Sequence, residues 1–148
     1  MSLYIHKRHN VSVLLYHLVC VAKFRRVIFD QEIDKQLKQI CLEIAKRYDI
    51  HFIEIGTDED HVHFLIQSIP TYSPTKIVRT IKSITARELF RYKADLREKV
   101  WGAELWSDGY FINTVGRTGS ESTITKYIQN QGKSRNYVVL HKDQLKMF

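Results

Sequence analysis

Two histidines separated by a single residue, His61 and His63, form the first pattern in the sequence that could carry chemistry. In an extended chain, side chains two positions apart point to the same side and their Cα atoms lie about 6.6 Å apart, so two imidazoles can bind one metal ion. Val62, Phe64 and Ile66 would then face the opposite side, toward a core. Two solvated histidines on a hairpin surface give the same pattern, because imidazole is tolerated there.

A tyrosine and a glutamine four residues apart, Tyr127 and Gln131, form the second pattern. In a helix, side chains at this spacing share one face about one turn apart. A tyrosine in a short amphipathic helix is usually a packing residue. A packing residue does not need an amide one turn away, however, whereas a metal or phosphate site does. A tyrosine hydroxyl can also attack a phosphodiester and hold the cut strand covalently, and the base that would deprotonate Tyr127 stays open.

The ligands in these two patterns favour a hard metal ion. Two imidazoles and one possible amide oxygen, with open positions for a phosphate, suit Mg²⁺ or Mn²⁺, whereas zinc would favour a third histidine or a cysteine. Such an ion would polarise the phosphoryl oxygen and orient the phosphate for in-line attack by the tyrosine on phosphorus. The acidic turn at residues 58–60 could add a carboxylate or orient the histidines, although acidic turns are ordinarily only solvated.

Basic residues give the chain a net charge of +7 and a pI of about 9.4, which is compatible with nucleic-acid binding. Aromatic residues lie among the cations, as suits a single strand whose bases are free to stack: Trp101, Trp106, Tyr110 and Phe111. Basic residues on a solvated helix face would give a similar pattern. The candidate DNA contacts are Lys23, Arg25, Arg26, Lys76, Arg79, Arg87, Arg91 and Arg117.

The elements that must position these residues follow from periodicity and breakers. After a loose polar start at residues 1–10, the sequence predicts a strand, a helix capped by Asp30, a two-stranded hairpin, a helix opened by Ser73 and Pro74, and a strand. The strands are expected at 11–23, 50–56, 61–68 and 110–115, and a last helix at 122–131. This βαββαβ order predicts an α+β, ferredoxin-like antiparallel sheet with both helices on one face and the other face open.

A length of 148 residues and an ordinary composition predict one domain, with 44% hydrophobic and 26% charged residues. We expect a core over about 10–115, a tyrosine-bearing helix over about 120–132, and a tail over 133–148. No stretch reaches the ~20 apolar residues of a membrane span. Cys20 and Cys41 lie in apolar surroundings, so we expect buried thiols and a cytoplasmic protein.

Two segments carry a resemblance to a known family. Residues 60–66 (DHVHFLI) resemble the HUH motif, in which U is a hydrophobic residue, and residues 125–131 (TKYIQNQ) resemble the tyrosine helix of single-tyrosine HUH transposases of the insertion sequence 200/605 type. Residues 16–19 (YHLV) and 23–26 (KFRR) also fit that family. The resemblance covers about residues 10–133, and the motif residues show no departure from its pattern.

The resemblance implies an enzyme that cuts and rejoins single-stranded DNA at the ends of a mobile element, guided by hairpins near those ends. Tyr127 would be the nucleophile, leaving a 5′-phosphotyrosine and a free 3′-hydroxyl, while His61, His63 and Gln131 would hold the divalent metal. The family works as a homodimer, and in many members the tyrosine helix acts in trans, at the partner's HUH site.

Two alternatives stay open at this point. A non-catalytic module of the same fold, such as the RRM, binds single strands through exposed aromatics, although residues 61–67 here carry histidines where stacking rings would be wanted. A domesticated HUH endonuclease acting on host DNA would share every motif. Metal-independent binding without cleavage would favour the binding module.

Overall fold

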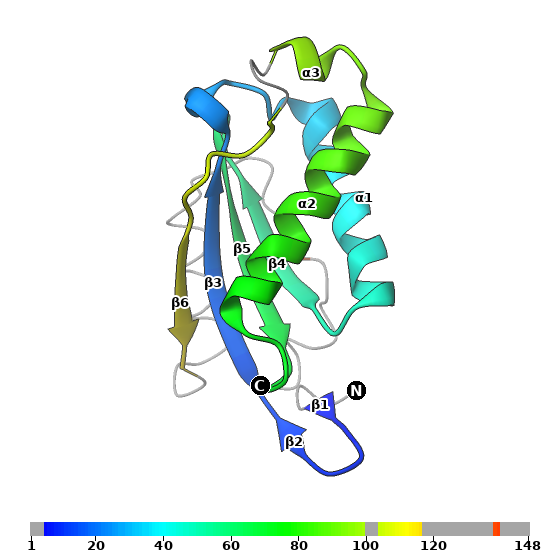
Figure 1. Ribbon diagram of the computed structural model, residues 1–148, viewed down its shortest axis with the longest axis vertical. Helices are drawn as coiled ribbons and strands as arrows, with labels where there is room; N and C mark the ends of the chain where they lie inside the picture. The colour runs from blue at the N-terminus through cyan, green and yellow to red at the C-terminus, as the bar shows by residue number, and fades with distance from the viewer. Residues whose placement is uncertain (1–4, 100–103, 117–137, 140–148) are drawn as a thin grey trace.

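The computed structural model describes residues 5–99 and 104–116 and the backbone of residues 138–139 (Figure 1). Five antiparallel strands form one sheet in the order β6-β3-β5-β4-β7. Their bounds are β3 (Leu14–Val21), β4 (His51–Thr57), β5 (His61–Ser68), β6 (Phe111–Val115) and β7 (Val138–Val139). The helices α1 (Gln31–Arg47) and α2 (Pro74–Tyr92) lie side by side on one face of this sheet (Figure 1). The ferredoxin-like prediction is therefore confirmed.

Both long helices begin where their capping residues predict. The Asp30 carboxylate accepts a hydrogen bond from the backbone N–H of Ile33 at 2.9 Å, at the start of α1. The Ser73 hydroxyl accepts one from the backbone N–H of Lys76 at 3.0 Å, and Pro74 opens α2. Each cap satisfies a backbone donor that the first helical turn leaves without a partner.

The core lies between this helical layer and the sheet. Leu18 and Cys20 of β3 and Phe64 and Ile66 of β5 are fully buried under the helices. The two cysteines are buried free thiols, as predicted, and burial raises the pKa of Cys20 to about 12. The alternation that sends these residues inward sends their neighbours on β3 and β5 to the opposite face.

Trp106 belongs to the core, so the prediction that its indole offers a stacking surface is wrong. The indole is 5% exposed, stacks on Phe29 with ring centroids 5.4 Å apart, and donates its Nε1–H to Thr85 Oγ1 at 2.9 Å. This hydrogen bond satisfies the polar group of an otherwise apolar ring. The other predicted tryptophan platform, Trp101, lies outside the described residues.

Four segments depart from the expected element pattern. The polar start is not loose, because β1 (Ile5–His6) and β2 (Val11–Ser12) pair in an antiparallel ribbon whose backbone groups satisfy each other (Figure 1). The tail contributes β7, which pairs with β4 at the edge of the sheet. Two short helical turns, η1 (Lys23–Arg25) and α3 (Leu96–Lys99), complete the described elements.

The expected tyrosine helix at 120–132, with Tyr127 and Gln131, lies outside the described residues. Among the helices that the structure describes, none is both long and apolar enough to cross a bilayer.

Candidate metal centre

The face of the sheet opposite the helices carries three histidines. On β5, His61 and His63 point to this face, as the alternation predicted, and His17 of the adjacent strand β3 joins them. The rings of His61 and His63 lie edge to face with centroids 4.9 Å apart, and the ring of His17 stacks on His63 with centroids 5.3 Å apart. His61 and His63 thus lie together on this face within one chain, as expected.

Two acidic residues of the β4–β5 turn hold His61. Its Nδ1 lies 2.7 Å from Asp60 Oδ1, and its Nε2 lies 3.3 Å from Asp58 Oδ2. The hydrogen bond from His61 lowers the pKa of Asp60, to which the charge of Arg25 also contributes, so this carboxyl is an acceptor at neutral pH. An ionised carboxylate can only accept, so Nδ1 of His61 donates to Asp60, while Nε2 faces Asp58 Oδ2 and would offer its lone pair to a cation bound between them.

His63 is held differently, by another imidazole in a buried environment. Its Nδ1 lies 3.1 Å from His17 Nε2, and its ring is 4% exposed. Burial lowers the pKa of His63 to about 4, and the charges of His17 and His61 act in the same direction. The ring is therefore neutral at pH 7, the form that can ligate a metal. In the part of the chain that the structure describes, His63 Nε2 has no hydrogen-bond partner.

These donors fit a divalent cation. One ligand atom from each of Asp58, His61 and His63 lies within 4.8 Å of the others. Two imidazole nitrogens and a carboxylate oxygen form a mixed donor set of the kind that binds divalent metal ions. The sequence suggested Asp58 only as one member of an acidic turn, and its proximity to His61 Nε2 now singles it out.

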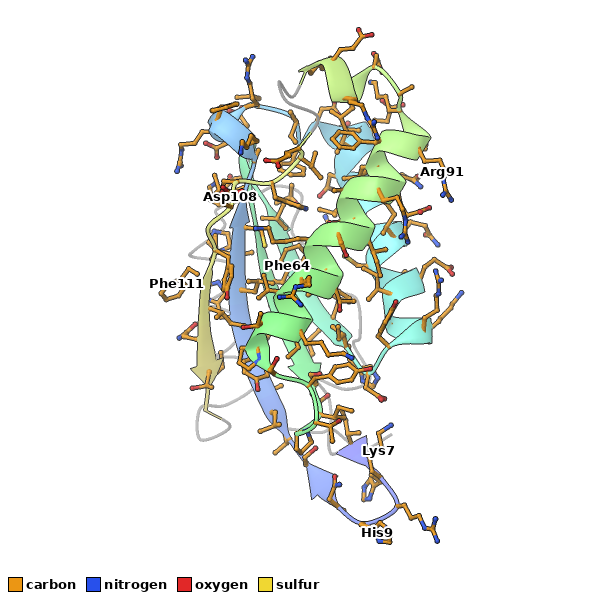
Figure 2. The ribbon with its side chains drawn as sticks, in the orientation of Figure 1. Lys7, His9, Phe64, Arg91, Asp108 and Phe111 are labelled. Carbon is orange, nitrogen blue, oxygen red and sulfur yellow. The ribbon has the colours of Figure 1, made fainter. Side chains whose placement is uncertain are left out.

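The accessible part of this face is smaller than the open sheet that we expected. His17, Leu65 and Gln67 are buried on it, while His61 is partly exposed and Phe111 is 55% exposed. A cavity of about 470 Å³ lies here; its lining residues are His17, Val19, Val21, Arg25, His61, His63 and Phe111. Figure 2 shows Phe111 projecting from β6 away from α2. A ligand at the histidines would therefore meet a cation on one side and an aromatic ring on the other.

A strained turn brings Arg25 to this cavity. Phe24 and Arg25, within η1, have φ angles of 57° and 51°, in the left-handed region that residues other than glycine rarely adopt. The guanidinium Nε of Arg25 lies 3.3 Å from Asp60 Oδ2, while Phe24 is 61% exposed. The turn thus connects a cation to the carboxylate that holds His61.

The predicted basic residues fall into two separate groups. Arg25 lines the cavity and Arg26 is exposed beside it, whereas Lys23 is paired with Glu104 at 2.7 Å. The second group lies exposed along α2, on the layer that covers the opposite face of the sheet: Lys76, Arg79, Arg87 and Arg91. Figure 2 shows Arg91 on the outer side of α2, and Arg117 lies outside the described residues. The structure therefore brings Arg25 to the histidines and leaves the α2 group away from them.

Comparison with known proteins identifies the class. Residues 10–131 match the family described as "Transposase IS200 like". The chain is 34% identical over 124 residues to the ISDra2 transposase TnpA of Deinococcus radiodurans, covering 84% of this chain and 88% of that one. It is 28% identical over 126 residues to the transposase for insertion sequence element IS200 of Salmonella typhimurium, covering 85% and 80%.

Solved structures agree with this result. A crystal structure of a chain assigned as a transposase from Deinococcus radiodurans R1 superposes with a TM-score of 0.69 at 29% identity, covering 86% of this chain and 97% of that one. A REP-associated tyrosine transposase bound to a REP hairpin shares the fold, with a TM-score of 0.59 at 12% identity over 87% and 73% of the chains. The protein is a transposase. Because the family match spans most of its length, it belongs to the IS200-like transposases, which confirms the resemblance at the level of the family.

Proposed function

We propose that this transposase cuts and rejoins single-stranded DNA at the ends of an insertion sequence, through a covalent 5′-phosphotyrosine on Tyr127. The observation that carries this proposal is the donor set at the end of β5. Asp58, His61 and His63 direct ligand atoms to within 4.8 Å of one another, and Nδ1 of each histidine is already engaged by another side chain. A protein that only bound DNA would have no need of this arrangement.

The divalent ion, Mg²⁺ or Mn²⁺, would be held by His61, His63 and Asp58, with Gln131 as a further oxygen ligand. When bound, it would polarise a phosphoryl oxygen of the DNA. The Tyr127 oxygen forms a bond to phosphorus as the bond from phosphorus to the 3′-oxygen breaks. The phenol loses its proton and the 3′-oxygen gains one, which leaves the free 3′-hydroxyl that can later reverse the reaction.

The strand would enter beside Arg25 and Phe111, the cation and the exposed ring that line the histidine cavity. A guanidinium can pair with a backbone phosphate and a ring can stack on a base, so this pair suits a single strand. Since a REP-associated relative of the same fold binds a hairpin, we extend hairpin binding to this chain. The basic residues along α2 are the surface that we assign to the hairpin stem.

A covalent-capture experiment tests the nucleophile. Labelled single-stranded DNA carrying the element end, incubated with Mg²⁺ or Mn²⁺, should yield a protein–DNA adduct that Tyr127→Phe abolishes. Tyr110→Phe is the control, because Tyr110 is another exposed phenol but lies on the α2 side of the sheet, where Lys82 sits over its ring, and it should keep the adduct. An adduct that persists in Tyr127→Phe would show that the nucleophile is wrong. Binding without any adduct in the wild type would favour the non-catalytic module.

Mixing two inactive variants tests the homodimer and the placement of the tyrosine. Tyr127→Phe lacks the nucleophile and His63→Ala lacks a ligand, so neither forms the adduct alone. If the tyrosine acts on the partner's histidines, a mixed dimer holds one complete site and activity returns. If each chain uses its own tyrosine, the mixture stays inactive.

A further inference from the structure

His17 is a polar residue that the proposed reaction does not use, buried in the middle of a central strand. Its ring is 1% exposed, and its neighbours on the same face of β3 are the apolar residues Leu15 and Val19. Burying an imidazole is costly unless the ring makes hydrogen bonds. The position of His17 therefore needs an explanation beyond packing.

The ring of His17 is fixed on two sides. It stacks on His63 with an angle of 10° between the planes, and it meets the ring of Phe111 edge to face with centroids 6.3 Å apart. The distance from His17 Nε2 to His63 Nδ1 is 3.1 Å. A neutral imidazole has one N–H and one lone pair, so one of these two nitrogens donates and the other accepts.

Metal ligation by His63 requires that its Nδ1 be the donor in this pair. His63 can offer Nε2 to a metal only if its own proton lies on Nδ1. That proton is then donated to His17 Nε2, and His17 must keep its proton on Nδ1. The reverse arrangement, with His17 as donor, would put the His63 proton on Nε2 and block the lone pair.

On this basis, and resting on the metal-dependent function above, we propose that His17 is a positioning residue that fixes the tautomer and the ring orientation of His63. His17 accepts a hydrogen bond from Nδ1 of His63, just as Asp60 accepts one from Nδ1 of His61. One acceptor is charged and the other neutral because the two sites differ in burial. The side chains of Asp60 and His61 are 24% and 23% exposed, whereas His17 is buried. A carboxylate at position 17 would lose most of its hydration, so a neutral acceptor is the less costly choice there.

Two substitutions at position 17 distinguish the role of the hydrogen-bond acceptor from that of the aromatic ring. His17→Phe keeps the ring and its stacking but has no acceptor, whereas the amide oxygen of His17→Gln can still accept from His63 Nδ1. Mn²⁺ affinity, measured on the full chain without DNA by electron paramagnetic resonance, should fall about 10- to 100-fold in His17→Phe. It should stay within a few-fold of wild type in His17→Gln and in the packing control Leu15→Val, on the same face of β3 but outside the cavity lining.

The tautomer itself provides a readout that needs no metal. In the metal-free wild type, ¹⁵N–¹H correlation spectra of labelled histidines should show His63 protonated at Nδ1, and His17→Phe should shift it toward the Nε2-protonated form. A wild-type His63 protonated at Nε2 would overturn the inference. Because this spectrum is recorded on the wild type, it tests the inference even if His17→Phe fails to fold. Wild-type affinity in a folded His17→Phe would overturn it too. A wild type that binds no Mn²⁺ would instead refute the proposed metal-dependent function.

Discussion

At the scale of single residues, the two ligand histidines are oriented by partners of unequal strength. Asp60 offers His61 a charged acceptor at 2.7 Å, and Arg25 contacts the other oxygen of the same carboxylate. His63 receives only a neutral acceptor from His17. Hydrogen bonds to charged groups are roughly twice as strong as neutral ones, so we expect His61 to be the more firmly oriented ligand.

Removing the Asp60 carboxylate tests this orientation. Asp60→Ala should lower Mn²⁺ affinity about 10- to 100-fold, because His61 loses the group that keeps its proton on Nδ1. Asp60→Asn, which retains a neutral acceptor, should fall between wild type and Asp60→Ala. Calorimetric titration with Mn²⁺ measures both.

Glu59→Ala is the control for charge. Glu59 is the exposed neighbour in the same turn, and its substitution changes the net charge by the same amount. If Glu59→Ala weakened binding as much as Asp60→Ala, a general loss of negative charge would explain the effect and the specific role of Asp60 would be lost.

The sequence could predict His61 and His63 as a pair, but it could not predict the part played by His17. A spacing of two residues on one strand is local information, and strand periodicity alone puts both rings on one side. His17 meets His63 across 46 residues of chain, through the register of β3 against β5, which local patterns do not specify. The available signal was one polar residue within an apolar strand.

At the scale of elements, the caps of the two long helices carry a stability prediction. Asp30→Ala removes the acceptor for the backbone N–H of Ile33 and should lower the free energy of unfolding by about 1 kcal/mol. Asp30→Asn retains an oxygen acceptor and should lose much less. Urea denaturation of the three proteins measures the difference, and equal losses in both variants would argue that the charge, rather than the cap, is what stabilises α1.

The sequence predicts the helices whose starts are set by capping residues. It does not predict the strands that form only by pairing with another strand. Asp30, Ser73 and Pro74 are helix-start signals that act within one turn, so the beginnings of α1 and α2 followed from them. The β1–β2 ribbon and β7 gain their structure from pairing with other strands. The prediction for Trp106 is wrong because residue type alone does not distinguish an exposed indole from one that, as here, is hydrogen-bonded inside the core.

At the scale of the whole molecule, cations lie on two different faces, which predicts two different effects on DNA binding. Arg25→Gln should weaken binding of a short single strand and reduce the slope of log affinity against log salt by about 0.7, the loss of one phosphate contact. Arg87→Gln removes the same charge from α2, where Arg87 already pairs with Glu88. It should leave the short strand unaffected and weaken only DNA that carries a hairpin.

Fluorescence anisotropy with the two DNAs at several salt concentrations measures these effects. The comparison is internally controlled, since both variants lose one positive charge. If both substitutions weakened the short strand equally, the two faces would not act separately, and the assignment of α2 to the hairpin stem would be wrong.

Buried histidines also make the stability of the whole molecule depend on pH. Burial lowers the pKa of His51, at the start of β4, below its ordinary 6.5. The unfolded chain therefore binds a proton at a higher pH than the folded chain does, and the free energy of unfolding should decrease as the pH falls below about 6.5. His51→Gln should make this decrease shallower without removing it, because burial also lowers the pKa of His17.

Thermal unfolding at pH 7.5 and pH 5.5 provides the measurement for both proteins. An identical decrease in wild type and His51→Gln would mean that His51 is not one of the groups responsible.

The two left-handed residues after β3 mean that the turn which positions Arg25 lowers the stability of the fold. Backbone strain of this kind costs of order 1 kcal/mol or more for each residue, and the exposed Phe24 ring contributes little packing in return. Asparagine tolerates such angles better, so Phe24→Asn should raise the temperature of thermal unfolding. Because asparagine would keep the left-handed angles, the contact between Arg25 and Asp60 should be kept as well, and the gain in stability should leave the metal centre intact.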